Sequence, residues 1–445
     1  MFSVLNKMVF GIDLGTTNSL IGSGDKLFSN LVSSSVDVEA KCQVDRDTVG
    51  ESIVSSYKTD MSMGEDGQLA IQCSSVILKD LAKKAKRRCG QEVKDVVISV
   101  PAYFSTTQRE AVYEAAKIAE LNVKCLINEP TAAAIYLCRD VKDLIVVYDL
   151  GGGTFDVTIV DSRLGTYQVI ATDGKILGGD DLDNALVERV FIDCKIPIRH
   201  RTALNRNKLR SKMRLAKEEI QRTRNTVYVD LTDIGGKNDF ELTEEIYRNV
   251  VYETFSETFE KTNYLIEKYI PESDVHKAVL VGGSSFCPYL REMIEENIPV
   301  EIIADDTPPD LIVAKGVSIY AKMVENGSAM TALEDVTKRL CISDYTGKTI
   351  TVIESNTVIP CESKVIVQNN IPSSKLKLRL YQGESIMAKK NDYIGMMVYD
   401  YGREVPADEG VVEVTVRVAH DGVVSLSACE VLYSDFVQEV KLIAR

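Results

Sequence analysis

The chain has 445 residues, of which 45% are hydrophobic and 27% charged, a composition ordinary for a globular protein of two or three domains. Its formal net charge of −14 argues against nucleic acid or an anionic membrane surface as a partner, because both attract basic patches. No apolar run is long enough to span a bilayer, and residues 1–10 lack the features of a signal peptide, so we expect no membrane segment.

The cysteines indicate the redox setting. All ten are scattered through the chain without a Cys-x-x-Cys pair, which favours reduced, buried thiols and a cytoplasmic location over a disulfide network. Because the chain has only three histidines, a zinc site built from histidine and cysteine is not expected.

The N-terminal part of the chain is predicted to alternate strands and helices. Residues 8–10 and 19–21 are apolar runs typical of strands, and the glycine-rich turn between them makes the pair a β-hairpin. A helix over about residues 75–89 carries the one basic cluster, residues 83–88, on a face that we expect to be solvated. Residues 105–108 form a capping-box pattern that predicts the start of a second helix.

The middle of the chain continues this alternation, which is typical of an α/β domain. Residues 144–148 and 157–160 are predicted strands on either side of a second glycine-rich turn. A helix over about residues 204–224 has its apolar residues on one face, and a longer helix is expected over about residues 243–269.

From about residue 340 onward the pattern changes to short alternating strands. Residues 375–381 and 411–418 are two of them, and residues 419–422 predict a hairpin turn. The change from helix–strand alternation to strands alone marks a domain boundary, and residues 325–329 are the predicted start of a linker.

Two glycine-rich turns, residues 11–18 and 149–156, indicate the chemistry. Glycine lets backbone amides approach an anion closely, so two such hairpins facing each other would hold the phosphates of a nucleotide triphosphate. Nearby carboxylates would lie where a hydrated Mg²⁺ binds. A glycine-rich hairpin without a ligand is the alternative for one turn alone, and the matching pair disfavours it. The acids are Asp13, Asp149 and Asp156, and the hydroxyls are Thr16, Thr17 and Thr154.

A third glycine turn supports this interpretation. Residues 282–285 follow a predicted strand at residues 278–281 and precede a helix that begins near Pro288. A strand, a Gly-Gly turn and a helix N-terminus commonly cup a nucleoside or a phosphate. Alone, this pattern is weak evidence of a ligand site.

Several motifs together resemble one family, the 70-kilodalton heat-shock chaperones of the DnaK type. They occur in the family's order and cover almost the whole chain. The segment around Lys58 is similar to that of specialised bacterial paralogues. The chain therefore resembles these paralogues most, as a short member of the family without a lid. The motifs are the two phosphate turns and residues 96–104, 127–134, 177–184, 280–284, 356–360 and 380–384.

The resemblance implies a fold and a division of the chain. An actin-like, sugar-kinase-like duplicated ATPase domain with two lobes would occupy residues 1–326, and an interdomain linker residues 327–338. An all-β sandwich domain that binds peptide would occupy residues 339–445. The sequence ends directly after the last predicted strand, so we expect no helical lid over the peptide groove and therefore fast peptide exchange.

The resemblance also implies roles for individual residues. ATP hydrolysis needs in-line attack of water and a metal that bridges the phosphates, so ATP or ADP and Mg²⁺ are the implied cofactors, with K⁺ as an additional candidate. Lys58, Glu129, Asp149 and Thr154 are the candidate catalytic residues, and Asp13, Asp149 and Asp156 form the candidate metal site. The candidate nucleotide-binding residues are Gly15, Thr16, Thr17, Asn18, Gly151, Gly152, Gly153, Lys217, Gly282, Gly283, Ser284, Phe286 and Asp310.

The chain departs from the family pattern at several positions. Phe286 stands where the family has an arginine that stacks on adenine, and Lys217 alone matches the Glu-x-x-Lys motif of its helix, so base preference is open. Lys58 lies in a segment with two extra residues, and an ordinary exposed helix lysine is its alternative. Cys125 replaces an arginine that contacts J-domain cochaperones. Residues 331–336 keep a single leucine of the family's leucine-rich linker, so domain coupling is open as well.

Three functions are consistent with these features. The leading one is an ATP-driven chaperone that binds unfolded or extended hydrophobic client peptides, with a J-domain cochaperone and a nucleotide-exchange factor as candidate partners. The second is an ATPase whose β-domain docks one assembly partner. The third is a small-molecule kinase, which fold alone does not exclude but which has no use for the β-domain motif at residues 380–384.

Overall fold

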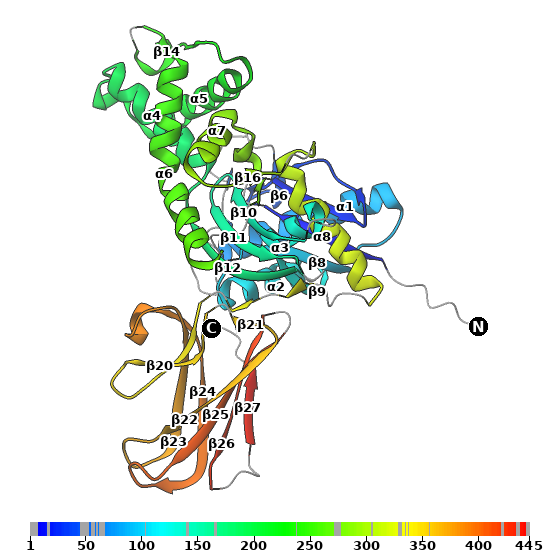
Figure 1. Cartoon of the computed structure of the whole chain (residues 1–445), viewed down its shortest axis with the longest axis vertical. Coiled ribbons are helices and arrows are strands. Elements are labelled where there is room, and N and C mark those ends of the chain that lie inside the picture. Colours follow the sequence, from blue (N-terminus) through cyan, green and yellow to red (C-terminus); the bar gives the residue numbers. More distant parts are fainter. Residues whose placement is uncertain are drawn as a thin grey trace, which may run out of the picture.

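The structure, a computed structural model, covers nearly all of both predicted parts of the chain (Figure 1). Two predicted site residues, Thr16 and Thr17, lie outside the described residues. The described residues are 8–441 without 16–17, 45–52, 55–57, 59–60, 62–66, 103, 139–141, 164–166, 237, 271–276, 304–305, 328–331, 334, 337, 356, 420–421 and 433–436.

The first sheet has the order β3-β2-β1-β8-β9, with β4 paired to β2. Strands β1 and β2 form the predicted antiparallel hairpin, and β8 runs parallel to β1. The apolar faces of α1 (Gln68–Cys89) and α2 (Thr106–Ile118) share a core with this sheet. Its strands are β1 (Val9–Leu14), β2 (Asn18–Ser23), β3 (Lys26–Leu27), β4 (Val32–Ser33), β8 (Asp95–Val100) and β9 (Asn122–Asn128), and a small neighbouring sheet holds β5 (Ser35–Asp37), β6 (Cys42–Val44) and β7 (Ile53–Val54).

The two helices of this lobe differ in how well the sequence marks their starts. Helix α2 begins as predicted, because Ser105 Oγ accepts from Gln108 N and Gln108 Oε1 accepts from Ser105 N, which is a complete capping box. Helix α1 begins at Gln68, earlier than the predicted start near Ser75. Its N-cap Gly67 offers no side-chain hydrogen bond, so burial of the first turns, rather than a capping signal, extends this helix.

The second sheet has the order β16-β15-β10-β11-β12-β17. Strands β10 and β11 form the second predicted hairpin, and β15 runs parallel to β10. Helix α7 begins at Pro288, as predicted. The strands are β10 (Leu144–Leu150), β11 (Phe155–Asp161), β12 (Tyr167–Lys175), β15 (Lys277–Val281), β16 (Glu301–Ile302) and β17 (Ala332–Leu333).

Beyond this sheet, an arm of helices extends to the top of Figure 1. Its long helices confirm the predicted ones, and Thr202 and Thr243 cap their N-termini. Among the described residues, no helix combines the length and apolar character needed to cross a membrane. The arm contains α4 (Gly179–Asp193), α5 (Ala203–Thr223), α6 (Glu244–Tyr269), α7 (Pro288–Asn297) and the paired strands β13 (Val227–Val229) and β14 (Phe240–Leu242).

Two helices, α3 (Glu129–Leu137) and α8 (Pro309–Glu325), pack together and share one core with strands of both sheets. The approach is close, because a Cβ at Gly316 would lie 1.8 Å from the carbonyl oxygen of Ala132. Only glycine fits such a contact. The two lobes are therefore joined by a tightly packed layer, and the fold is the predicted two-lobed α/β architecture.

The C-terminal part is a sandwich of two four-stranded antiparallel sheets, ordered β20-β19-β23-β24 and β22-β25-β26-β27, around a single core. This confirms the predicted all-β fold. A further pair, β18 (Asp335–Val336) and β21 (Thr357–Val358), precedes it. The strands are β19 (Leu340–Ser343), β20 (Thr349–Ile353), β22 (Cys361–Gln368), β23 (Ser373–Gln382), β24 (Asp392–Val405), β25 (Val411–Val418), β26 (Val424–Glu430) and β27 (Val437–Lys441).

The sandwich contacts the α/β part directly (Figure 1). Strand β17, from the predicted linker, adds in parallel to the edge strand β12. Gln382 Oε1 accepts a hydrogen bond of 3.0 Å from the backbone N–H of Thr106, at the N-terminus of α2. The β-sandwich therefore supplies an acceptor to a helix of the first lobe.

All ten cysteines are free thiols, as predicted. The prediction that they are buried is wrong for Cys42, which lies exposed on β6, and five others are only half-buried, namely Cys89, Cys125, Cys194, Cys361 and Cys429. Cys73, Cys138, Cys287 and Cys341 are buried.

Candidate active site

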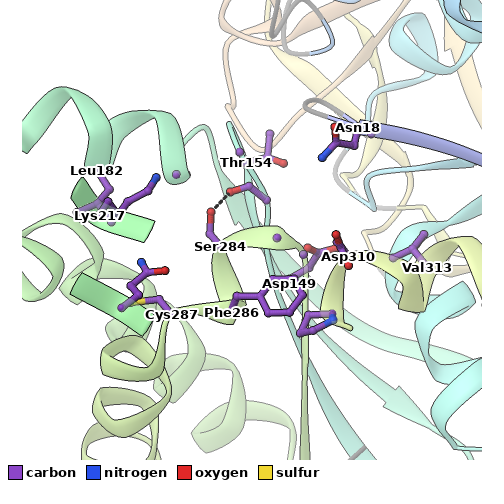
Figure 2. A pocket seen from close by; sticks show the side chains of 18 of the residues that line it. Asn18, Asp149, Thr154, Leu182, Lys217, Ser284, Phe286, Cys287, Asp310 and Val313 are labelled. Atoms are coloured by element: carbon purple, nitrogen blue, oxygen red, sulfur yellow. Dashed lines mark hydrogen bonds between the residues drawn. The ribbon is translucent and has the colours of Figure 1, made fainter. Parts of the chain in front are cut away.

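A cavity of about 540 Å³ is lined by residues from all three glycine turns. Figure 2 shows Asn18 of the first turn on one side of it and Lys217 on the opposite side, with Thr154 and Ser284 between them. The predicted site residues that line the cavity are Asp13, Gly15, Asn18, Lys58, Glu129, Asp149, Gly151, Gly152, Thr154, Lys217, Gly282, Gly283, Ser284, Phe286 and Asp310.

The second and third turns are held together by hydrogen bonds. Ser284 Oγ donates to the carbonyl oxygen of Gly151 over 2.7 Å, and Gly179 N donates to the same oxygen over 3.0 Å. Gly282 has φ of 85°, and a Cβ there would lie 2.4 Å from the carbonyl oxygen of Leu150. The third turn can therefore cross the end of β10 only because it begins with glycine.

Asp13 and Asp149 are the next-to-last residues of the central strands β1 and β10 of the two sheets. Asp13 accepts a hydrogen bond of 3.0 Å from Ser99 Oγ on the neighbouring strand β8. Because both hairpins place an acid at the same relative position, the two carboxylates face one cavity from opposite lobes.

Lys58 and Glu129 form a buried ion pair within this cavity. Glu129 is the first residue of α3, and the Lys58 ammonium lies 5.9 Å from the centre of the Phe104 ring. The Lys58 side chain is only 5% exposed, so the alternative of an ordinary exposed lysine is wrong. A buried ammonium can donate to a phosphate oxygen, and the acids around it would need a bound cation before a phosphate approaches.

The carboxylates of this cavity have strongly perturbed proton affinities. Burial, followed by repulsion from Glu129, raises the pKa of Asp13 to about 7, and Lys58 and the Ser99 hydrogen bond oppose the shift. Burial and the charges of Glu129 and Asp13 raise the pKa of Asp149 well above its usual range. The pKa of Asp156 is raised in the same way, by burial first and then by Glu129 and Asp149. In the phosphate half the acids outnumber the Lys58 ammonium, and this is why burial and mutual repulsion raise their pKa values.

This donor set fits Mg²⁺, which prefers carboxylate oxygens and keeps several waters and phosphate oxygens of its own. Asp156 Oδ1 is buried without a hydrogen-bond partner among the described residues. A water of a hydrated cation bound near Asp149 could donate a hydrogen bond to this oxygen. No three His, Cys, Asp or Glu side chains of the described residues are grouped as ligands of one ion, and Mg²⁺ bound through water and phosphate needs one or two carboxylates.

The other half of the cavity is built from α5 and from the turn before α7. Lys217 forms a buried ion pair with Asp183 of α4. Gln221 donates through its amide nitrogen to Tyr247 Oη. The Phe286 side chain is 49% exposed although it lines the cavity, so one flat apolar surface is available to a ligand.

The sequence analysis and the structure differ on several members of the site. Gly153 and Asp156 do not line the cavity. Asp156 is buried on β11, where it pairs with Asp149 of β10. The sequence analysis missed Asp183, Gln221 and two neighbours on α5. The one available signal was their spacing, since residues three and four apart share a helix face. The missed residues of α5 that line the cavity are Glu218, Gln221 and Arg222.

Comparisons with known proteins agree with this architecture. A protein-family model described as Hsp70 protein matches residues 24–442. The chain is similar to the chaperone protein DnaK of Mycoplasma mobile, with 30% identity over 462 aligned residues that cover 95% of this chain and 76% of the relative.

Proposed function

The chain belongs to the Hsp70 family of ATP-dependent chaperones, and on that premise we propose that ATP bound in the cavity controls the binding of peptide by the C-terminal β-sandwich. As a member of this family the chain is an ATPase. We propose residues 1–326 as the ATPase domain, 327–338 as the linker and 339–445 as the peptide-binding domain. The observation that carries the proposal is the cavity that joins both glycine hairpins, the buried acids and Lys58.

In this proposal each part of the phosphate half has a role. Lys58 neutralises charge that spreads over the γ-phosphate, and Glu129 and Asp149 orient the attacking water. Thr154 and the glycine amides of the turns donate to phosphate oxygens. Asp13, Asp149 and Asp156 would hold Mg²⁺ and its waters, with K⁺ as a further candidate ion. When bound, Mg²⁺ neutralises phosphate charge and fixes phosphate geometry.

Communication between the domains is proposed to pass through α2. Its first turn donates to Gln382 of the β-sandwich, and Arg109 of the same helix donates to Asn128, the residue before Glu129. The β25–β26 turn also approaches this helix, because a Cβ at Gly422 would lie 3.4 Å from Arg109 Cδ. A shift of α2 would therefore change contacts both at the sandwich and beside Glu129.

We propose that extended hydrophobic peptide binds the sandwich near β22 and the loop after Gly383. This loop is tied to the β19–β20 hairpin, since Thr349 N donates to Ile386 O and Ala388 N donates to Gly347 O, both over 2.9 Å. Main-chain hydrogen bonds and apolar contacts are the usual means of holding an extended segment. The exposed apolar side chains available to it include Tyr345, Ile366, Ile386 and Met387.

Peptide exchange by the 445-residue polypeptide is proposed to be fast. The apolar side chains of this region are 45–77% exposed, and an open surface resists dissociation only through its own contacts. Fluorescence anisotropy of a labelled hydrophobic peptide would measure the release rate. Release as slow as that of a family member with a lid would contradict the proposal.

The decisive experiment is steady-state ATP turnover with and without excess hydrophobic peptide. Peptide should raise turnover, and Lys58→Ala should abolish it, because the buried acids would then face the γ-phosphate without a cation. Lys117→Ala is the matched control, since this lysine is 77% exposed and pairs with Glu114 of its own helix. Loss of turnover in both variants would contradict the role given to Lys58.

The second candidate is an ATPase whose sandwich docks one assembly partner. Two observations favour it, namely Cys125 on β9 at the position that would contact a J-domain cochaperone and the single leucine in residues 331–336. J-domain and nucleotide-exchange partners therefore stay proposals, as does the cytoplasmic location suggested by ten free thiols. Turnover that is measurable but indifferent to peptide would favour this candidate.

A further inference from the structure

The half of the cavity opposite the phosphate turns carries a set of side chains that the phosphate chemistry does not use. Glu218, Gln221 and Arg222 project from one face of α5, three and four positions apart, and all line the cavity. Phe286 lies in the turn that faces them. With the phosphates of a nucleotide on the glycine turns, its base would occupy this half.

Phe286 provides the stacking surface. It is 49% exposed, whereas Phe255, the other phenylalanine that lines the cavity, is 1% exposed and belongs to the core. An aromatic side chain can stack on any base, because every base has a π-face. A larger purine covers more of the phenyl ring than a pyrimidine does. Phe286 therefore favours purines without distinguishing adenine from guanine.

Two of the polar groups in the base half, on Gln221 and Glu218, offer hydrogen-bond acceptors. The Gln221 amide nitrogen donates to Tyr247 Oη, so the amide oxygen of Gln221 can accept a hydrogen bond from a ligand in the cavity. Glu218 is exposed and makes no hydrogen bond or ion pair to any other described residue. An ionised carboxylate only accepts hydrogen bonds. Arg222, the neighbouring donor, is a cation that can reach acceptors of the base.

We propose that the base half of the cavity accepts guanine as well as adenine, with Glu218 as the specificity-determining residue. Guanine offers adjacent N–H donors at N1 and N2, which match the carboxylate of Glu218, and acceptors at O6 and N7 for Arg222. Adenine offers the single amino group at N6, which can donate to either Gln221 or Glu218. The inference rests on the proposed function, because it requires the cavity to be the nucleotide site.

The inference predicts a distinct pattern of affinities. GTP should bind within about tenfold of ATP, because stacking on Phe286 serves both purines. CTP should bind more weakly than either, by less than the roughly tenfold effect of removing the ring, because a pyrimidine covers only part of the phenyl surface. Glu218→Ala should weaken the binding of GTP by about tenfold, the low end for a charge-assisted hydrogen bond at an exposed side chain. It should weaken the binding of ATP by less than about threefold.

Competition with a fluorescent ATP analogue in the presence of Mg²⁺ tests these values. ATP, GTP, CTP and inorganic tripolyphosphate serve as competitors for the full chain. Glu219→Ala is the matched control, since Glu219 is the exposed neighbour on α5 and does not line the cavity. Phe286→Ala should weaken ATP and GTP by the same factor, about tenfold. All positions changed are exposed, and circular dichroism verifies that each variant is folded.

Three results would overturn the inference. They are GTP more than about tenfold weaker than ATP, Glu218→Ala acting equally on ATP and GTP or on neither, and tripolyphosphate competing as well as ATP. Failure of the proposed function gives a different result, because ATP itself would then not displace the probe. The two failures are distinguishable in one experiment.

Discussion

Removing the side chain of Gln382 should loosen the contact between the two domains. This side chain is 4% exposed, and its Oε1 accepts from both the backbone N–H and the hydroxyl of Thr106, over 3.0 and 3.4 Å. Its amide nitrogen donates to the carbonyl oxygen of Lys338. The substitution Gln382→Ala removes these hydrogen bonds without adding bulk.

The magnitude follows from the position of Thr106 in its helix. The N–H groups of the first turn have no partner within the helix, and Thr106 is buried, so its amide depends on Gln382 when the domains are in contact. A buried donor left without an acceptor costs about 1–3 kcal/mol. When the domains separate, water replaces Gln382, so the cost falls on the docked arrangement alone. The docking equilibrium should shift about 5- to 150-fold towards separation.

Hydrogen exchange at the N-terminus of α2 measures this shift directly. The Thr106 amide should exchange faster in Gln382→Ala, whereas the Gln108 amide, which Ser105 caps within the same lobe, should keep its rate. Gln368→Ala is the matched control, since Gln368 lies exposed on β22 of the same sandwich. Unchanged exchange at Thr106 in the variant would refute the reasoning, because the bond to Gln382 would then contribute nothing to docking.

Three further outcomes are expected. Folding raises the pKa of Asp13 from 3.8 to about 7, so between these values the folded protein keeps a proton on Asp13 that the unfolded chain has lost. The contribution of this proton to the stability of nucleotide-free protein is therefore full at low pH and is lost as pH rises through about 7. In urea denaturation, Asp13→Asn should make the free energy of unfolding depend less on pH over this range. Burial raises the pKa of the Cys138 thiol to about 12, so iodoacetamide at neutral pH should modify exposed Cys42 in native protein but Cys138 only after unfolding, as peptide mapping can check. Gly316→Ala should destabilise the fold by about 3 kcal/mol or more, measured by denaturation, since its Cβ would meet Ala132 O at 1.8 Å.

Much of the fold could be predicted because the signals are local. The capping box at Ser105, the hairpins around both glycine turns and the long helix capped by Thr243 each depend on residues a few positions apart. The change to period-two strands after about residue 340 is equally local. Such patterns determine the type of an element directly. They carry no information about which elements meet.

The parts of the site that the sequence did not predict depend on contacts between distant segments. Lys58 and Glu129 were predicted as site residues, but their ion pair was not, and it joins positions 71 apart. The hydrogen bond between Thr106 and Gln382 joins positions 276 apart. The role of α5 depends on which of its faces meets the cavity, and that is set by its packing against α4 and β13. The start of α1 likewise follows from burial of its first turns. Tertiary packing is what local propensity leaves undetermined.

Two separate routes connect the cavity with the sandwich, and their contributions can be separated. One passes from Asn128 through Arg109 of α2 to Gln382. The other lies in the second sheet, where β10 and β11 carry the acids of the cavity and the linker strand β17 pairs with β12 of the same sheet. Gln382→Ala removes the Gln382 contact of the first route and leaves the approach of Gly422 to Arg109 in place. If peptide still raises ATP turnover in that variant, the remaining stimulation measures what the sheet, its linker strand and the Gly422 contact transmit together, and if stimulation disappears, the Gln382 contact carries the coupling.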